Sequence, residues 1–323
     1  MRNGRAMHPS LAPSLILTAD AVARGCDDRR LARACEAGHL VRVSRGACVT
    51  PETWSELDPR ERQALRAVAA ARTRRRNDLA LSHESAALMW GLPTWGWPQG
   101  PVEFLASGDG RAHTTPDVRV RLAPTDEEDV TSLDDVSLTS LRRTVLDLLL
   151  TRERVQAVVL VDHVLRAGSL TRADLADLLA TRPGARNRRR AAWAVAFGDA
   201  RAESPGESVS RVLARDAGLV VPQLQRPFSD ARGSIGVVDF FFPDPDGSGR
   251  GRIGEFDGDV KYLGGQFRHG RTPEQVVAEE KAREDRLRAL ATTSGFVRWT
   301  RHDLARPERL AGLLGAAGVG RGR

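Results

Sequence analysis

The sequence predicts a protein of several domains in the α/β (α+β) class. Its 323 residues exceed what one hydrophobic core usually serves. The N-terminal part has the pattern of two short helices and two strands, and the C-terminal part that of a helix, three strands, a helix and a strand. Between them lies a stretch of mixed helix and strand patterns. We expect four segments: 11–55, 56–182, a basic helical linker at 183–202, and 203–317.

The charge balance is basic, with 49 lysines and arginines against 42 acids and a net charge of +7. Such a balance indicates a polyanionic partner, most commonly nucleic acid, although a solvated arginine-rich surface gives the same balance. Only two of these cations are lysines, Lys261 and Lys281. Because an ammonium is a compact point charge that can lose its proton, a lysine in an arginine-rich chain indicates a chemical role.

The three cysteines, Cys26, Cys35 and Cys48, lack the C-x-x-C spacing of zinc sites. Their odd number favours reduced thiols over a disulfide framework. The sequence has no apolar run of transmembrane length, and its first residues lack the sustained apolar segment of a signal peptide. We therefore expect a cytoplasmic protein.

The N-terminal region gives a clear local pattern. TADAVARGC predicts a helix from an N-cap at Thr18 to Gly25, and DDRRLARACEAG predicts a second helix that an aspartate caps and Gly38 closes. HLVRVSRGACV alternates as two strands around a turn at Arg45-Gly46. This is the order of a winged helix-turn-helix, whose second helix enters the major groove of DNA while the wing contacts phosphates. A small helical domain that contacts proteins is the alternative. The arginines exposed for DNA are Arg29, Arg30 and Arg33 on the helix and Arg42 and Arg45 on the wing.

The middle region predicts helices at 60–76, 81–93, 137–150 and 155–168 and strands at 101–106 and 118–123. Tryptophans in apolar helix-turn segments are more often core residues than stacking platforms for bases. Histidines in such segments are more often structural than ligands. We therefore expect structural roles for Trp90, Trp95, Trp97, His83 and His163.

The winged-helix pattern, LSHESAALMWGLP and TSLRRTVLDLLL together resemble actinobacterial proteins with an AbiEi-type antitoxin N-terminal domain. The resemblance covers about residues 11–180. It implies a winged helix followed by a middle α/β domain. It also implies binding to promoter DNA, repression of the protein's own operon, and a toxin–antitoxin operon partner.

A Pro-Gly pair marks a domain boundary near residue 200. The predicted order after it, helix, three strands, helix and strand, is the αβββαβ core order of the PD-(D/E)XK, restriction-endonuclease-like nucleases. The helices are expected at 206–218 and 273–291, and the strands at 219–228, 234–243, 251–258 and 295–300.

Acidic residues interrupt this block where metal chemistry would need them. Asp239 lies inside the apolar strand VVDFFF, where an unpaired carboxylate is costly to bury. On the next strand Glu255 and Asp257 share one face, because side chains alternate. If the two strands are neighbours, Asp239 and Glu255 can bind one cation, which Glu207 can help to hold. Mg²⁺ (or Mn²⁺) prefers such oxygen ligands and activates water for attack on phosphodiesters. A solvated DGD turn is the alternative, but it leaves Asp239 unexplained.

The motifs ESVSR, VVDF, GEFDGDVKY, EEKAREDRLRAL and GFVRWT resemble PD-(D/E)XK domains of the very-short-patch-repair endonuclease-like group over about residues 203–317. The resemblance implies Glu207 as the helix acid, Asp239 and Glu255 as metal ligands, and Asp257 as an accessory acid.

The family's general motif has a lysine at the position of Asp257. Lys261, just past the strand, and Lys281, on the following helix, are the lysines that could replace it. Lys281 could instead pair with Asp285 four residues later. The loop GGQFRHGRT adds two arginines for phosphate contacts and His269 as a weaker general-base candidate.

Two functions are consistent with these patterns. One is a DNA-binding protein with a Mg²⁺-dependent endonuclease domain. The other is an AbiEi-like antitoxin or transcriptional repressor whose nuclease-like domain is inactive.

Overall fold

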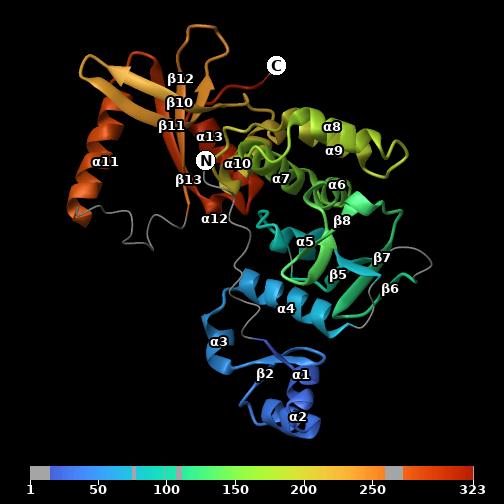
Figure 1. Cartoon of the computed structure of the whole chain (residues 1–323). Helices are drawn as coiled ribbons and strands as arrows, with labels where there is room; N and C mark the ends of the chain where they lie inside the picture. Colours follow the sequence, from blue (N-terminus) through green and yellow to red (C-terminus); the bar gives the residue numbers. More distant parts are fainter. Residues whose placement is uncertain (1–14, 75–77, 98, 107–110, 259–271, 323) are drawn as a thin grey trace. The chain divides into compact units, whose positions relative to one another are not determined.

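The computed structural model describes residues 15–74, 78–97, 99–106, 111–258 and 272–322. The chain folds into two compact units: unit 1 contains residues 1–160 and 170–196, and unit 2 contains residues 161–169 and 197–323. Both units combine helices with β-sheet (Figure 1), so the predicted α/β multidomain class is confirmed. The finer division into four segments stays a prediction. No helix in the described ranges is long and apolar enough to cross a membrane.

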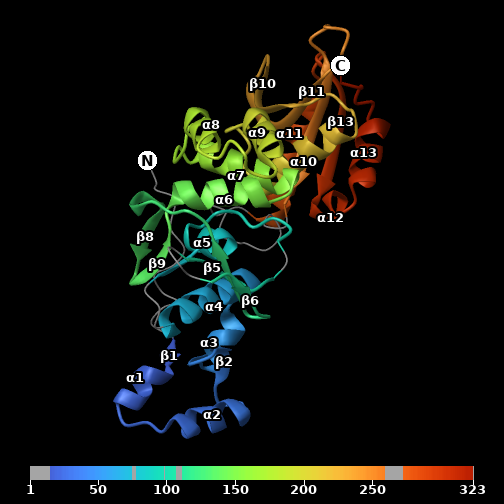
Figure 2. The same cartoon turned by 90° about the vertical axis from the view of Figure 1, so that its right-hand side faces the viewer.

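Unit 1 begins with two short helices and a small antiparallel sheet (Figure 2). The elements are β1 (Ile16–Leu17), α1 (Thr18–Ala23), α2 (Asp28–Glu36), β2 (Val41–Ser44) and β3 (Ala47–Val49). Asp27 caps α2, because its carboxylate accepts a hydrogen bond from the Arg29 amide at 3.0 Å. Helix α1 follows Leu17 without a side-chain cap, so the predicted capping role of Thr18 is wrong. Gly46 makes the turn between β2 and β3 with a φ of 83°, as expected.

A six-stranded sheet of order β6-β7-β5-β4-β9-β8 forms the centre of unit 1. Its elements and their neighbours are α3 (Pro51–Glu56), α4 (Pro59–Thr73), β4 (Leu79–Leu81), α5 (His83–Met89), β5 (Val102–Ala106), β6 (His113–Thr114), β7 (Val118–Leu122), a 3-10 helix (Glu127–Asp129), β8 (Val130–Leu133) and β9 (Val136–Thr139). Val68 of α4 and Met89 of α5 share a core with Phe104 of this sheet. Leu65 of α4 also packs with Val49 of the small sheet. Helix α4 therefore joins the two sheets of unit 1.

Four helices follow the large sheet: α6 (Leu141–Thr151), α7 (Arg154–Arg166), α8 (Arg172–Ala180) and α9 (Arg188–Phe197). The helix predicted at 137–150 starts later, because Val136–Thr139 pairs with β8 as a strand. Ser140 then caps α6 by accepting a hydrogen bond from the Arg143 amide. Helix α9 lies in the segment predicted as a basic helical linker.

Unit 2 contains a four-stranded sheet of order β10-β11-β12-β13. Neighbouring strands from β10 to β12 are antiparallel, and β13 is parallel to β12. The chain order of helix, three strands, helix and strand is the predicted one. The elements are α10 (Pro205–Asp216), β10 (Gln223–Asp230), β11 (Gly233–Pro243), β12 (Gly251–Asp257), α11 (Pro273–Arg288), β13 (Thr293–Thr300), α12 (Arg301–Leu304) and α13 (Pro307–Ala316).

The two faces of this sheet are covered by different helices (Figure 1). On one face Leu287 of α11 packs with Phe241 and Ile253. On the other face the buried Trp299 packs against Phe240, with 4.8 Å between ring centroids, and its indole donates a hydrogen bond to Ser210 of α10 at 2.8 Å. Unit 2 is therefore a three-layer arrangement of helix, sheet and helices.

Candidate functional site

Glu207 lies in the first turn of α10, which Ser204 caps. Its carboxylate is buried and accepts hydrogen bonds from the Glu203 amide at 2.9 Å, the Ser204 hydroxyl at 2.8 Å and the Gln225 side chain at 3.1 Å. Burial raises the pKa of Glu207, and the negative charge of Asp239 raises it further, against the opposing effect of the hydrogen bonds. The two carboxyl groups are therefore close enough to interact electrostatically.

Asp239 lies on β11 beside the backbone of β12. Its Oδ2 accepts a hydrogen bond from the Phe256 amide at 2.9 Å. The register pairs Phe240 with Gly254, so the next residues along the two strands are Asp239 and Glu255. The strands that carry these acids are neighbours, as the two-carboxylate hypothesis required. That the acids share one cation stays a prediction.

Glu255 is 4% exposed and lies on the face of β12 toward α11. Its Oε1 accepts a hydrogen bond from Arg283 Nη2 at 3.1 Å. The same guanidinium donates to the Val237 carbonyl at 2.7 Å, and it lies against Gly236, where an added Cβ would come within 3.2 Å of Arg283 Nε. The missing side chain at this glycine therefore leaves room for the arginine beside Glu255.

Asp257 also lies beside an arginine. Arg298 on β13 is 3.8 Å from its carboxylate and also pairs with Glu280 at 2.8 Å and Glu284 at 3.3 Å. Burial would lower the pKa of Arg298, but these carboxylates raise it above its usual value. Arg298 is thus held between β12 and α11 by several acids.

Of the two lysines, Lys281 lies within the described residues. Lys261 and the loop with His269 lie outside the described residues. Lys281 is exposed on α11, two residues before Arg283. Because residues two apart do not share a helix face, Arg283 is the α11 cation beside Glu255. Sequence reasoning missed Arg283 and Arg298, since it searched for a lysine; the arginines within EEKAREDRLRAL and GFVRWT were the available signal.

The described residues fit a metal site in part. Glu207, Asp239 and Glu255 supply oxygen atoms, which are the ligands that Mg²⁺ prefers. A cation near Glu207 and Asp239 would relieve the cost of their burial and mutual repulsion. Within the described ranges, however, no three Asp, Glu, His or Cys side chains gather closely enough to hold a metal ion.

The five arginines predicted to contact DNA are all exposed in unit 1. The structure separates them into two groups. The α2 group consists of Arg29, Arg30 and Arg33. Arg42 and Arg45 lie on β2 and its turn, and they line a cleft of about 1600 Å³ to which the α2 group does not contribute.

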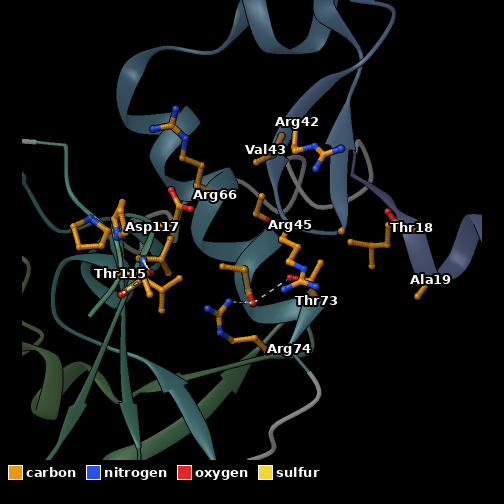
Figure 3. Close-up of a pocket in the computed structure, with 18 of the residues that line it drawn as sticks. Thr18, Ala19, Arg42, Val43, Arg45, Arg66, Thr73, Arg74, Thr115 and Asp117 are labelled. Atoms are coloured by element: carbon orange, nitrogen blue, oxygen red, sulfur yellow. Dashed lines mark hydrogen bonds between the residues drawn. The ribbon is translucent and has the colours of Figure 1, made fainter. Parts of the chain in front are cut away.

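Residues of α1, of α4 and of the loops beside β5 and β7 also line this cleft (Figure 3). The turn between β2 and β3 lies against the end of α4, because a Cβ at Gly46 would be 3.4 Å from Thr73 Cγ2. The lining has a net charge of +3, from Arg42, Arg45, Arg66, Arg74 and Asp117.

The tryptophans of the middle region have packing partners in unit 1. The Trp90 indole donates a hydrogen bond to the Thr139 carbonyl at 2.9 Å, and Arg152 lies over the Trp97 ring at 5.3 Å. His83 is buried, and its Nδ1 shares a hydrogen bond of 3.1 Å with the Ser82 hydroxyl. These contacts agree with the structural roles expected for Trp90, Trp97 and His83.

No protein-family model matches the chain. Two curated Mycobacterium tuberculosis proteins, the uncharacterized protein MT2308 of strain CDC 1551 / Oshkosh and the uncharacterized protein Rv2248 of strain H37Rv, are each 35% identical over 91 residues. The match covers 28% of this chain and 34% of each relative, so the chain spans about a third of the length of the curated relatives it matches.

Among solved structures, the crystal structure of the RV2827C protein from Mycobacterium tuberculosis is similar over 71% of this chain and 90% of that chain. The sequence identity is 15% and the TM-score is 0.38. A TM-score at this level does not establish a shared fold.

Proposed function

We propose that the protein binds DNA through unit 1 and hydrolyses phosphodiester bonds with a Mg²⁺-dependent, PD-(D/E)XK-like unit 2. The observation that carries the proposal is the set of acids Glu207, Asp239 and Glu255 on α10, β11 and β12. These elements follow the αβββαβ chain order of that nuclease class. Glu207 and Glu255 are buried and Asp239 is partly buried. Buried carboxylates are costly unless a partner or a cation compensates them, and clusters of such acids are common at functional sites.

In this proposal Asp239 and Glu255 hold the cation and Glu207 assists them. A bound Mg²⁺ would supply a water of lowered pKa and would stabilise negative charge on the phosphate. The N-cap residue Ser204 fixes the position of Glu207 on α10. The hydrogen bond from the Phe256 amide fixes the Asp239 carboxylate. These protein contacts keep the carboxylates oriented, which favours binding of a small cation that demands strict geometry.

The test is cleavage of plasmid, linear and nicked DNA in the presence of Mg²⁺ or Mn²⁺. Asp239→Asn and Glu255→Gln remove a charge but retain an oxygen that can accept the present hydrogen bonds. We expect each to reduce cleavage by about 100-fold or more, since metal stabilisation amounts to several kcal/mol. Asp216→Asn, an exposed acid at the end of α10, is the matched control and should cleave like wild type. Equal rates for all four proteins would remove the nuclease proposal.

A second candidate is a DNA-binding repressor or antitoxin whose unit 2 is inactive. The pairing of Glu255 with Arg283 and of Asp257 with Arg298 favours it, because each acid already has a cation. This function requires DNA binding without divalent-dependent cleavage. It also predicts that a purified toxin from the same operon, where one exists, co-elutes with the protein.

DNA binding by the α2 group has its own test. Arg29→Ala/Arg33→Ala should weaken retention on duplex DNA and reduce the slope of log K against log salt by about 2, because each phosphate contact contributes about 0.9. Arg111→Ala/Arg186→Ala removes two exposed arginines elsewhere in unit 1 and serves as the control. No difference between the two double variants would argue against α2 as the DNA contact.

A further inference from the structure

The cleft beside the wing has the charge of an anion-binding site. Four arginines and one aspartate supply the charged groups among its described lining residues. Two of the arginines, Arg42 and Arg45, come from the small sheet and its turn, and two, Arg66 and Arg74, come from α4. Arginines from separate elements that line one cleft give it a positive potential, which favours an anionic ligand.

Arg74 is oriented at the end of α4 by contacts on two sides. Its Nη1 donates to the Ala70 carbonyl at 3.2 Å, and its guanidinium lies over the Phe104 ring at 5.0 Å. Burial lowers the pKa of Arg74, which means that its charged form is incompletely solvated. A phosphate oxygen would restore the lost interaction, and the planar guanidinium can donate two hydrogen bonds to it.

Arg66 and Arg45 reach the cleft from different elements. Arg66 of α4 lies over the ring of Trp54 of α3 at 5.4 Å. Arg45 precedes Gly46 in the turn that packs on Thr73. Figure 3 shows the Arg45 side chain in the part of the cleft next to Thr73. The cationic groups are thus distributed along the cleft rather than gathered at one point.

The cleft is large enough to hold part of a polymer. Its volume of about 1600 Å³ exceeds the roughly 300–1,000 Å³ of common small-molecule sites. Separated arginines match the regular spacing of phosphates along a nucleic-acid strand better than they match one compact anion.

We propose that this cleft binds the sugar–phosphate backbone of duplex DNA, with Arg45, Arg66 and Arg74 as phosphate ligands. The inference rests on the proposed DNA-binding function and adds a second contact surface to the α2 group. It assigns to α4 a role in DNA affinity that the winged-helix pattern does not imply. Because backbone contacts carry little sequence information, this surface should raise affinity for all duplexes alike.

The experiment measures binding of the full chain to a fluorescein-labelled duplex by anisotropy at several NaCl concentrations. Arg66→Gln/Arg74→Gln should reduce the slope of log K against log salt by about 2, with similar losses on unrelated sequences. Asp117→Asn, which removes the carboxylate of the lining, should raise affinity several-fold. A misfolded variant cannot reproduce a gain in affinity, so Asp117→Asn tests the cleft even where Arg74→Gln lowers stability.

The outcomes separate this inference from the proposed function. Weaker duplex binding by Arg66→Gln/Arg74→Gln and tighter binding by Asp117→Asn would support DNA binding in the cleft. If Arg66→Gln/Arg74→Gln and Asp117→Asn both keep the affinity and salt slope of wild type, the cleft does not bind DNA. If Arg29→Ala/Arg33→Ala then binds weakly, DNA binding through α2 still holds. Absence of duplex binding by the wild-type protein overturns both.

Discussion

Arg283 of α11 donates a hydrogen bond to the buried Glu255 of β12, with 3.1 Å between Nη2 and Oε1. The same side chain binds the Val237 carbonyl of β11 at 2.7 Å. One arginine therefore ties the helix to two strands and neutralises an acid proposed to hold a metal. A cation at Glu255 would have to share the carboxylate with Arg283 or displace it.

The first prediction concerns Arg283→Gln. Loss of the Arg283 guanidinium leaves Glu255 buried without this cation. The free energy of unfolding should therefore fall by about 1–3 kcal/mol, which is less than for a fully buried pair because Arg283 is partly exposed. Millimolar Mg²⁺ should then raise the melting temperature of the variant more than that of wild type, because ligand binding stabilises the folded state.

The control for this prediction is Arg288→Gln. Arg288 lies on the same helix and pairs with Glu284 at 2.7 Å, but half of its side chain is exposed. Exposed pairs contribute little, so this variant should melt close to wild type with and without Mg²⁺. An equal Mg²⁺ shift in wild type and Arg283→Gln would count against Glu255 as a metal ligand.

The sequence predicted the chain order of unit 2 because hydrophobic alternation is a local signal. It also located Asp239, since an acid in an apolar strand breaks that alternation. It did not predict the partners of Glu255 and Asp257. Arg283 is 28 residues from Glu255 in the chain, and such a contact depends on how α11 packs on the sheet.

Contacts between residues far apart in the chain also explain why the sequence did not predict the cleft in unit 1. The turn between β2 and β3 and its arginines follow from the local pattern around Gly46. The cleft does not, because it forms only when that turn packs on Thr73 at the end of α4. The sequence pattern predicts a helix where strand β9 lies, because the four strand residues, Val136–Thr139, are too few to show a period of two clearly before the apolar helix that follows.

The second prediction uses the close approach of α10 to β12. A Cβ on Gly206 would lie 2.0 Å from Phe256 Cε1, so Gly206→Ala must displace the ring or the helix. Such overpacking costs about 1–3 kcal/mol. The substitution should also disturb Asp239, whose carboxylate accepts a hydrogen bond from the Phe256 amide. Urea denaturation followed by circular dichroism measures the loss.

Gly312→Ala is the matched control for Gly206→Ala. Gly312 is exposed within α13, and an added Cβ would meet no atom within 4 Å. Because alanine favours helices over glycine by about 1 kcal/mol, this variant should be as stable as wild type or more so. A similar loss in both variants would contradict the steric argument.

The third prediction concerns the ion pair of Asp162 and Arg211 in unit 2. The two side chains are 1% and 4% exposed and their charged atoms are 2.8 Å apart. Asp162 also accepts a hydrogen bond from the Asp199 amide at 2.6 Å. Arg211→Met leaves a buried carboxylate without its cation, which should cost about 3–5 kcal/mol. Thermal unfolding measures the change.

Two further variants test that explanation. Arg215→Met, at an exposed position one turn later on α10, should change stability by less than about 0.5 kcal/mol. Asp162→Leu/Arg211→Met removes both charges and should recover much of the loss, since burying neither ion avoids the desolvation cost. A double variant as unstable as Arg211→Met would show that the loss comes from packing instead.

The fourth prediction concerns the pH dependence of unit 1 through His83. Burial lowers the pKa of His83, although the charges of Asp147 and Glu103 oppose the shift. Its pKa in the folded state is therefore below the unfolded value of about 6.5. Protonation favours the unfolded chain, so this contribution to stability is complete above pH 6.5 and is lost as pH falls below it, by at most about 1.4 kcal/mol per pH unit.

His83→Asn tests this contribution, because His83 has a φ of 49° and asparagine tolerates the left-handed region better than most residues. The variant cannot gain a proton at this site, so its free energy of unfolding should fall less than that of wild type between pH 7 and pH 5. His113→Asn, on the exposed strand β6, is the matched control. Urea titrations at each pH supply the comparison. Superimposable pH profiles for wild type and His83→Asn would mean that His83 takes up its proton equally in the folded and unfolded chains.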